Sequence, residues 1–249
     1  GITQQTLRDP EIIIVDSGST DNTVAIAEGY PVKIVHIRPE DFTFGRSLNT
    51  GIAAASGDVI VITSAHCYPL YPDWLEQLVQ PFQNPQIALS YGKQTGAETN
   101  HFSEHQFFRK YFPETSVRTQ AHPYAHNANA AIRKSLWDEH PYNEALTGLE
   151  DLAWSSWAVE SGYDIAYVAE AAVVHQHDET WQQVHNRYKR EAIALKQILP
   201  ESQFTLANFL RAWLRESLSD LNEARHESVL REHWFGIIWF RLMQYWGTY

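Results

Sequence analysis

Residues 46–67 read RSLNTGIAAASGDVIVITSAHC, and this stretch decides the fold. Residues 46–56 are rich in small side chains and stop before Gly57, a pattern that predicts a helix ending at that glycine. Residues 58–63 form an apolar run with β-branched side chains, so we expect a strand buried on both faces. A polar stretch that contains His66 follows this strand at once. A helix and a buried strand in this order indicate an α/β sheet, whose ligands bind beyond the carboxyl ends of its strands.

The alternation of strands and helices continues on both sides of this stretch. Before it, residues 12–15 predict a strand, residues 24–29 a helix and residues 32–37 a second strand. After it, the pattern predicts a helix over residues 72–82, a strand over 86–96, a strand and a helix start over 125–137, a helix over 149–162 and a last strand over 163–177. Such alternation is typical of a doubly wound, mostly parallel sheet.

Two segments depart from the alternation. Residues 99–124 are rich in His, Phe, Tyr and Pro with little periodicity, so we expect a covering loop with short helices. From residue 206 to residue 245, apolar side chains keep helical spacing, which predicts two amphipathic helices. We therefore expect an α/β domain over residues 1–198 and a C-terminal helical extension over residues 199–249.

The composition excludes several classes of protein. A chain of 249 residues that is 44% hydrophobic can bury one substantial core, which argues against disorder. A formal net charge of −11 argues against nucleic acid as a partner, because phosphate backbones attract a surplus of Lys and Arg. The single cysteine, Cys67, excludes an intrachain disulfide and suits a reducing cytoplasm, where we expect a small buried side chain at this position. The richest apolar run, WFGIIWF, is shorter than the roughly 20 residues that span a bilayer.

Four motifs resemble family 2 glycosyltransferases of the GT-A fold, notably the bacterial rhamnosyltransferase-like group. The motifs are IIIVDSGSTDNT, FGRSLNTGIAAASGDVIVITSAHCYP, GLEDLAWSSWAVESGYDIAYVAEAAVVHQH and the closing RLMQYWGTY, and the resemblance covers roughly residues 1–195. Such enzymes start with a strand and turn of the type VVIPxYN, whereas this chain opens with GITQQTLRD, similar to the end of the helix that follows that strand. We expect that the first strand is missing from the sequence, through omitted upstream residues, a misplaced gene start or degeneration. Omission is favoured because a sheet without its middle strand would have unpaired backbone groups.

The resemblance implies a nucleotide-diphosphate sugar as the donor. Asp16, with Ser17 beside it, occupies the position whose carboxylate in the family accepts hydrogen bonds from the base or ribose. The residues alone also predict a turn in which Ser19 or Asp21 caps the next helix, and both interpretations can hold, with Asp16 the ligand residue and Asp21 the structural one.

A second donor contact is implied by the motif RSLN. Asn49 matches the asparagine of the family's RN motif, but Leu48 stands where the family has arginine. A phosphate or base contact is therefore either lost or moved to Arg46.

The resemblance also implies a divalent metal, Mn²⁺ or Mg²⁺. The residues TSAH match the DxD motif of the family, so that His66 takes the place of the second, metal-binding aspartate and Ser64 that of the first. Polypeptide N-acetylgalactosaminyl transferases are similar, with Asp-Ser-His-Cys and a later histidine that His175 matches, and His177 is a further candidate. Imidazole ligands without the first aspartate favour Mn²⁺ over Mg²⁺. The alternative is that His66 and His175 hydrogen-bond a diphosphate or each other.

The resemblance places the catalytic base in the motif LEDLAW. Asp151 matches the family's base, and Glu150 is its neighbour at the donor site. A displacement that inverts the anomeric carbon needs one carboxylate to accept the proton of the acceptor hydroxyl. The alternative is that two acids at a helix start simply favour the helix dipole. We further expect Asn127 and Asn129 to line the sugar pocket, and residues 187–190 either to offer cations for a phosphate or to form a helix surface.

These features lead to one main hypothesis and two alternatives. We expect an inverting, nucleotide-sugar-dependent hexosyl- or deoxyhexosyltransferase that acts on a glycan or lipid-linked acceptor in surface polysaccharide synthesis. Ser64 and Leu48 favour a catalytically weak or inactive binding protein of the same fold. A cation-dependent nucleotidyltransferase is disfavoured because no phosphate loop rich in Gly, Arg and Lys is present. The aromatic residues of the tail predict that the core, a second subunit in a homodimer, or the inner face of the cell membrane covers them.

Overall fold

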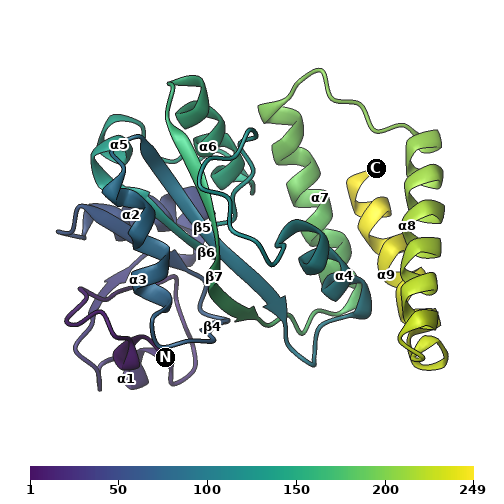
Figure 1. Cartoon of the computed structure of the whole chain (residues 1–249), viewed down its shortest axis with the longest axis horizontal. Coiled ribbons are helices and arrows are strands. Elements are labelled where there is room, and N and C mark those ends of the chain that lie inside the picture. The colour runs from purple at the N-terminus through teal and green to yellow at the C-terminus, as the bar shows by residue number, and fades with distance from the viewer. The chain divides into compact units, whose positions relative to one another are not determined.

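The computed structural model describes all residues, 1–249, and the chain divides into two compact units (Figure 1). The first unit comprises Gly1–Lys93 and Glu114–Val173, and the second comprises Gln94–Pro113 and Val174–Tyr249. Two strands, β5 (Ile87–Gly96) and β7 (Asp164–His175), begin in the first unit and end in the second. The division expected at residue 198 stays a prediction.

The first unit contains a small parallel sheet. Strands β1 (Ile13–Asp16) and β2 (Lys33–His36) pair in parallel, and α1 (Thr23–Ala27) connects them. Both strands and the helix between them agree with the sequence pattern. The strand-helix-strand order expected of a mixed α/β fold is therefore confirmed for residues 13–36.

The larger sheet has the strand order β3-β6-β5-β7-β4. Its further strands are β3 (Val59–Thr63), β4 (Cys67–Pro69) and β6 (Asn129–Arg133), and β6 runs antiparallel to both β3 and β5. The prediction that β3 is buried on both faces is wrong, since all five of its residues are only half-buried. The reason is that β3 is an edge strand whose one neighbour is β6.

The core of the first unit lies between this sheet and α3 (Trp74–Val79). Trp74 and Leu78 are fully buried and pack in one cluster with Ile87 and Val173 of the sheet. Each such side chain contributes about 1.5–3 kcal/mol through removal of its apolar surface from water. The remaining elements of this unit are α2 (Phe44–Ala53), α5 (Lys134–Glu139), α6 (Glu150–Glu160) and short 3₁₀ helices at Ile2–Gln4, Pro39–Asp41 and Gln80–Gln83.

The second unit is mainly helical. Its helices are α4 (Phe102–Tyr111), α7 (Trp181–Ile198), α8 (Leu206–His226) and α9 (Leu230–Thr248), and α9 packs along both α7 and α8 (Figure 1). Gly247 permits this close approach, because a Cβ atom there would lie 2.4 Å from the carbonyl oxygen of His185. The two helices predicted for the tail are confirmed. No helix of the chain is long and apolar enough to span a membrane.

Candidate functional site

Asp16 organises the loop that follows β1. Its Oδ1 accepts the Ser19 backbone N–H at 3.1 Å, its Oδ2 accepts the Gly18 N–H at 3.1 Å, and Nδ1 of His36 lies 3.3 Å from Oδ2. Hydrogen bonds from the Ser19 side chain first, and then from these backbone and histidine groups, outweigh burial and lower the pKa of Asp16 to about 2. The carboxylate is therefore charged and already holds its own loop, and its role toward a nucleotide stays a prediction.

The rest of this loop is shaped by turn residues. Ser17 is half-buried beside Asp16, and Gly18 has φ +95°, a conformation in which a Cβ atom would lie 2.5 Å from Cγ of Pro39. Oδ1 of Asp21 accepts the Thr23 N–H at 2.9 Å in the first turn of α1. Asp21 therefore stabilises the turn before α1, whereas the N-cap residue of this helix is Asn22, whose side chain makes no capping hydrogen bond.

Asn49 and Arg46 lie on α2 and bind the same glutamate. The Asn49 amide donates to Oε1 of Glu144 at 3.0 Å, and Nε of Arg46 donates to Oε2 of Glu144 at 2.9 Å. Asn49 also donates to the Tyr142 carbonyl at 2.9 Å and accepts from Trp137 Nε1 at 2.9 Å and from the Tyr142 N–H at 3.0 Å. These four bonds use the full hydrogen-bonding capacity of the amide. Asn49 and Arg46 therefore bind other residues of the chain. These hydrogen bonds do not support the predicted contact of the two side chains with the donor.

Asn129 is a buried structural residue, which corrects its expected place in the sugar pocket. Its side chain has no solvent exposure, donates to the carbonyls of Lys93 at 3.1 Å and Ala171 at 2.8 Å, and accepts from Nε1 of Trp74 at 2.9 Å. The amide therefore ties β5, β6 and β7 to α3. Both donors and one acceptor position of this amide are used within the protein, and its full burial leaves no exposed group for a ligand.

Asp151 lies in the first turn of α6, where the backbone holds its carboxylate. Oδ2 accepts the N–H of Asn127 at 3.1 Å, and Oδ1 accepts the N–H of Leu152 at 2.8 Å. The preceding Leu149 has φ +56°, which is rare for a bulky residue and is concentrated at functional sites. The side chain of Asn127 accepts from the Tyr142 hydroxyl at 3.2 Å, while its buried Nδ2 has no hydrogen-bond partner.

Tyr142 links Asp151 to the network of α2. It is buried, and desolvation first and the charge of Asp151 second raise its pKa well above the usual value, so the hydroxyl stays protonated and donates to Asn127. Its backbone N–H is bound by Asn49. Glu150, next to Asp151, is buried in the same helical turn. Asn49, Tyr142, Asn127 and Asp151 thus form one connected chain within the first unit.

His175 and His177 form a close pair in the second unit. Their Nε2 atoms lie 3.0 Å apart. Nδ1 of His175 lies 2.7 Å from Oε1 of Gln94, and Nδ1 of His177 lies 2.7 Å from Oε1 of Glu104. A carboxylate oxygen can only accept, so Nδ1 of His177 donates to Glu104, and the Nε2 atoms of the two rings are left facing each other. Two nitrogens at about 2.1 Å from one ion are separated by about 3 Å at a right angle, so the pair fits a shared divalent metal.

Glu104 orients this pair and is held by a further cation. Its Oε1 accepts from Nη2 of Arg187 at 2.7 Å, and the same Nη2 lies 2.6 Å from Oε2 of Glu179. Burial alone would raise the pKa of Glu104, but the hydrogen bond from His177 and the charges of Arg187, His177 and His101 outweigh it and lower that pKa to about 2. Metal-binding histidines usually donate their other nitrogen to such a group. Sequence reasoning missed Glu104 and Gln94, because neither lies in a motif with a spacing that points to the histidines.

His66 belongs to the first unit, where it follows β3 in an exposed turn. The turn is closed by the Ser64 carbonyl, which accepts the Cys67 N–H at 3.0 Å, while the Ser64 N–H donates to Ala128 at 3.2 Å. Cys67 is buried as expected, and burial raises the pKa of its thiol to about 12. The partnership of His66 with the histidines of the second unit stays a prediction.

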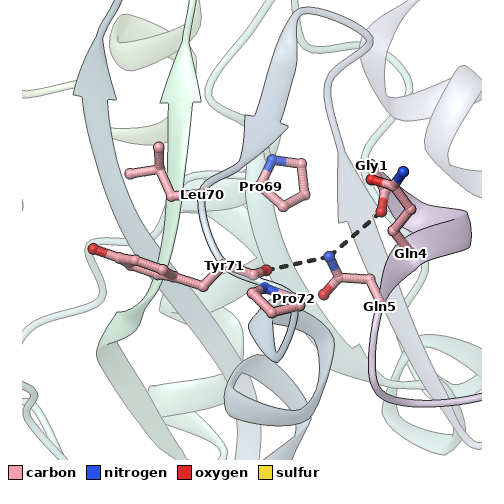
Figure 2. Close-up of a pocket in the computed structure, with 7 residues that line it drawn as sticks. All are labelled: Gly1, Gln4, Gln5, Pro69, Leu70, Tyr71 and Pro72. Carbon is pink, nitrogen blue, oxygen red and sulfur yellow. Dashed lines mark hydrogen bonds between the residues drawn. The ribbon is translucent and has the colours of Figure 1, made fainter.

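A shallow pocket of about 170 Å³ lies elsewhere in the first unit (Figure 2). Nε2 of Gln5 donates to the Tyr71 carbonyl at 3.2 Å across it. The lining residues are Gly1, Gln4, Gln5, Pro69, Leu70, Tyr71 and Pro72. None of the predicted site residues is among them, so this pocket is not the candidate site.

Comparison with solved structures assigns the fold to the GT-A class. A mannosyltransferase from Pyrobaculum calidifontis, solved in complex with GDP-Man and Mn²⁺, superposes with a TM-score of 0.63 at 19% identity, over 97% of this chain and 77% of that one. The sequence narrows the class further, since residues 1–140 match the model of glycosyl transferase family 2. The chain belongs to this family.

Two curated relatives are both O-antigen chain rhamnosyltransferases. RfbN of Salmonella typhimurium is 30% identical over 199 residues, which are 75% of this chain and 63% of that protein. WbaN of Salmonella anatum is 30% identical over 202 residues, which are 74% of this chain and 62% of that protein. The matched region thus spans less than two thirds of the length of these relatives.

Proposed function

We propose that the protein transfers a sugar from a nucleotide-diphosphate sugar to a hydroxyl group of a glycan or lipid-linked acceptor, with inversion at the anomeric carbon. A deoxyhexose of the rhamnose type is the preferred donor sugar, and surface polysaccharide synthesis is the setting. Family membership and the two O-antigen rhamnosyltransferase relatives support this proposal. The buried cysteine Cys67 suits the reducing cytoplasm in which we expect the protein to act.

The observation that carries the proposal is the held carboxylate of Asp151. Two backbone N–H groups fix its oxygens at 3.1 Å and 2.8 Å, in a helix turn that starts at the strained Leu149. In the proposed reaction this carboxylate accepts the proton of the acceptor hydroxyl, while the hydroxyl oxygen bonds to the anomeric carbon and the bond from that carbon to the diphosphate breaks. The unpartnered Nδ2 of Asn127 would supply a hydrogen bond to a bound sugar or acceptor hydroxyl.

His175 and His177 are the proposed ligands of a divalent metal, with His66 as a third ligand on the strength of its sequence motif. Their facing Nε2 atoms at 3.0 Å support the first two assignments. Nitrogen ligands favour Mn²⁺ over Mg²⁺. When bound, the ion would neutralise the charge of the diphosphate. Asp16 and Ser17 remain the proposed contacts of the base or ribose, with Glu150 at the donor sugar.

A nucleotide-sugar panel tests this function. We expect slow release of the free nucleotide diphosphate from one donor, and faster release when an acceptor is added. Binding of a nucleotide without any release would instead favour a binding protein of the same fold. Three observations favour this second candidate. Ser64 and Leu48 stand where the family has an aspartate and an arginine, and Arg46 is bound to Glu144 of the same chain.

A further inference from the structure

Helices α8 and α9 each expose a stripe of large apolar side chains. On α8 the stripe repeats every four residues, and on α9 every three to seven, so that each stripe stays on one side of its helix. The exposed fraction of these side chains lies between 36% and 64%. We call the two stripes together the tail face, which consists of Leu206, Leu210, Leu214, Leu218, Phe235, Trp239, Trp246 and Tyr249.

Other sides of both helices are used for packing within the second unit, a side next to the leucine stripe on α8 and the opposite side on α9. On α8, Asp220 is buried against Arg241 of α9, with Nε to Oδ2 at 2.8 Å, and Glu216 lies 3.8 Å from Lys110 of α4. On α9, the buried Phe240 and Gly247 face α7. At about 100° of rotation per residue, both stripes point away from α4 and α7. They therefore share one outer side of the α8 and α9 pair.

Basic side chains border the tail face. Arg211, Arg215 and Arg225 are exposed on α8 and lie next to the leucine stripe by helical rotation, and Arg231 is exposed at the start of α9. The acids Glu216 and Glu223 project from the other side of α8, although Glu216 also pairs with Arg215 at 2.8 Å. On α9 the exposed Glu232 lies in line with the apolar stripe, so the surplus of positive charge is confined to the edge of α8. This local row of arginines, on a chain of net charge −11, indicates a partner with negative charge next to its apolar surface.

We propose that the tail face lies in the interface of an anionic lipid bilayer, with α8 and α9 parallel to the membrane plane. Leucine side chains suit the acyl boundary, tryptophan and tyrosine prefer the head-group level, and the arginines meet the lipid phosphates. A second copy of the chain is a poorer occupant, because an isologous contact whose two-fold axis crosses the helices would bring two identical arginine rows together. The proposal does not depend on the transfer reaction proposed above.

Vesicle flotation of the full chain tests this proposal. We expect binding to vesicles of phosphatidylcholine with phosphatidylglycerol, and weaker binding to phosphatidylcholine alone. The double change Leu214→Glu with Leu218→Glu should weaken binding by at least about tenfold, since it places charges in the apolar stripe. Arg211→Gln should weaken binding to the anionic vesicles by about fivefold. The matched control is Ile26→Glu on α1, because Ile26 is 63% exposed but lies outside the tail face, and it should bind like the unchanged protein.

Two further measurements separate the membrane from other occupants. Brominated lipids should quench the fluorescence of the unchanged protein more than that of Trp246→Phe, because Trp246 would enter the interface. Circular dichroism should show that each variant stays folded. If the folded protein fails to bind anionic vesicles, the proposal is wrong. It is also overturned if light scattering shows a dimer that Leu214→Glu with Leu218→Glu converts to a monomer, since a second copy would then cover the face.

Discussion

The Nε2 atoms of His175 and His177 face each other at 3.0 Å, because the Nδ1 atom of each ring is bound to an oxygen of Gln94 or Glu104. With both Nδ1 atoms bound to oxygens, the two Nε2 atoms can share either a proton or a metal ion, so that a proton and a metal compete for the same position.

Removal of one imidazole should weaken metal binding. We expect His177→Ala to lower the affinity for Mn²⁺ by at least about tenfold, and Mn²⁺ to bind more tightly than Mg²⁺ to the unchanged protein. Affinity should also fall as the pH is lowered, because protons compete for the ring nitrogens. Titration calorimetry measures both effects. The control is His226→Ala at the exposed end of α8. If both variants bind Mn²⁺ with equal affinity, His175 and His177 are not the ligands of the metal.

The contribution of His66 can be tested separately. Ser64→Asp would restore a carboxylate at the first position of the motif and should tighten Mn²⁺ binding by about tenfold if His66 and its turn belong to the metal site. His66→Ala should weaken it. If neither change has an effect, residues 64–66 do not take part in metal binding, and a bound ion would use only the histidines of the second unit.

Glu104 should make stability depend on pH. Its pKa is lowered to about 2 in the folded protein, below its value in the unfolded chain, so its contribution is complete above about pH 4.5 and is lost as the pH falls toward 2. Urea unfolding of Glu104→Gln should therefore differ from the unchanged protein at pH 7, and the difference should shrink at acid pH. A difference that is independent of pH would contradict this account.

Asn49→Ala should destabilise the protein rather than selectively impair nucleotide binding. Loss of four hydrogen bonds at about 1 kcal/mol each predicts a decrease of about 2–4 kcal/mol in the free energy of unfolding. The control is Asn22→Ala, because Asn22 makes no capping hydrogen bond at the start of α1 and the change should cost less than about 0.5 kcal/mol. If Asn49→Ala leaves stability unchanged but abolishes nucleotide binding, Asn49 contacts the donor, as the RN motif suggests.

Local pattern explains why much of the fold could be predicted. Strands β5 and β7 and helices α6, α8 and α9 each have an apolar period or a stop signal of their own, such as Gly162 with φ +87° after α6. The antiparallel pairing of β6 and the edge position of β3 depend on neighbours far away in the chain. Helix α4 was expected only as part of a loop, because its aromatic residues show little periodicity.

The candidate site shows the same limit at the level of single residues. Asp151 and His175 could be proposed from the sequence because each lies at the end of an element within a motif, Asp151 at the start of α6 and His175 at the end of β7. Asn49 and Asn129 were assigned to ligands because an asparagine in a motif gives no sign of its partners. The structure shows that those partners, among them Glu144 and Trp74, come from other elements. Composition and spacing do not encode such contacts.

Asp151 is the proposed general base of the sugar transfer. Asp151→Asn keeps the volume of the side chain but cannot take up the proton, so we expect transfer from the active donor to fall by about 10² to 10⁴-fold while nucleotide-diphosphate affinity stays nearly unchanged. Asp138→Asn, on the exposed end of α5, is the matched control and should retain full activity. The direct test is the turnover rate and the nucleotide affinity of Asp151→Asn, measured side by side. A large loss of rate at constant affinity is the predicted result, and an equal loss of both, or full activity, would contradict the account.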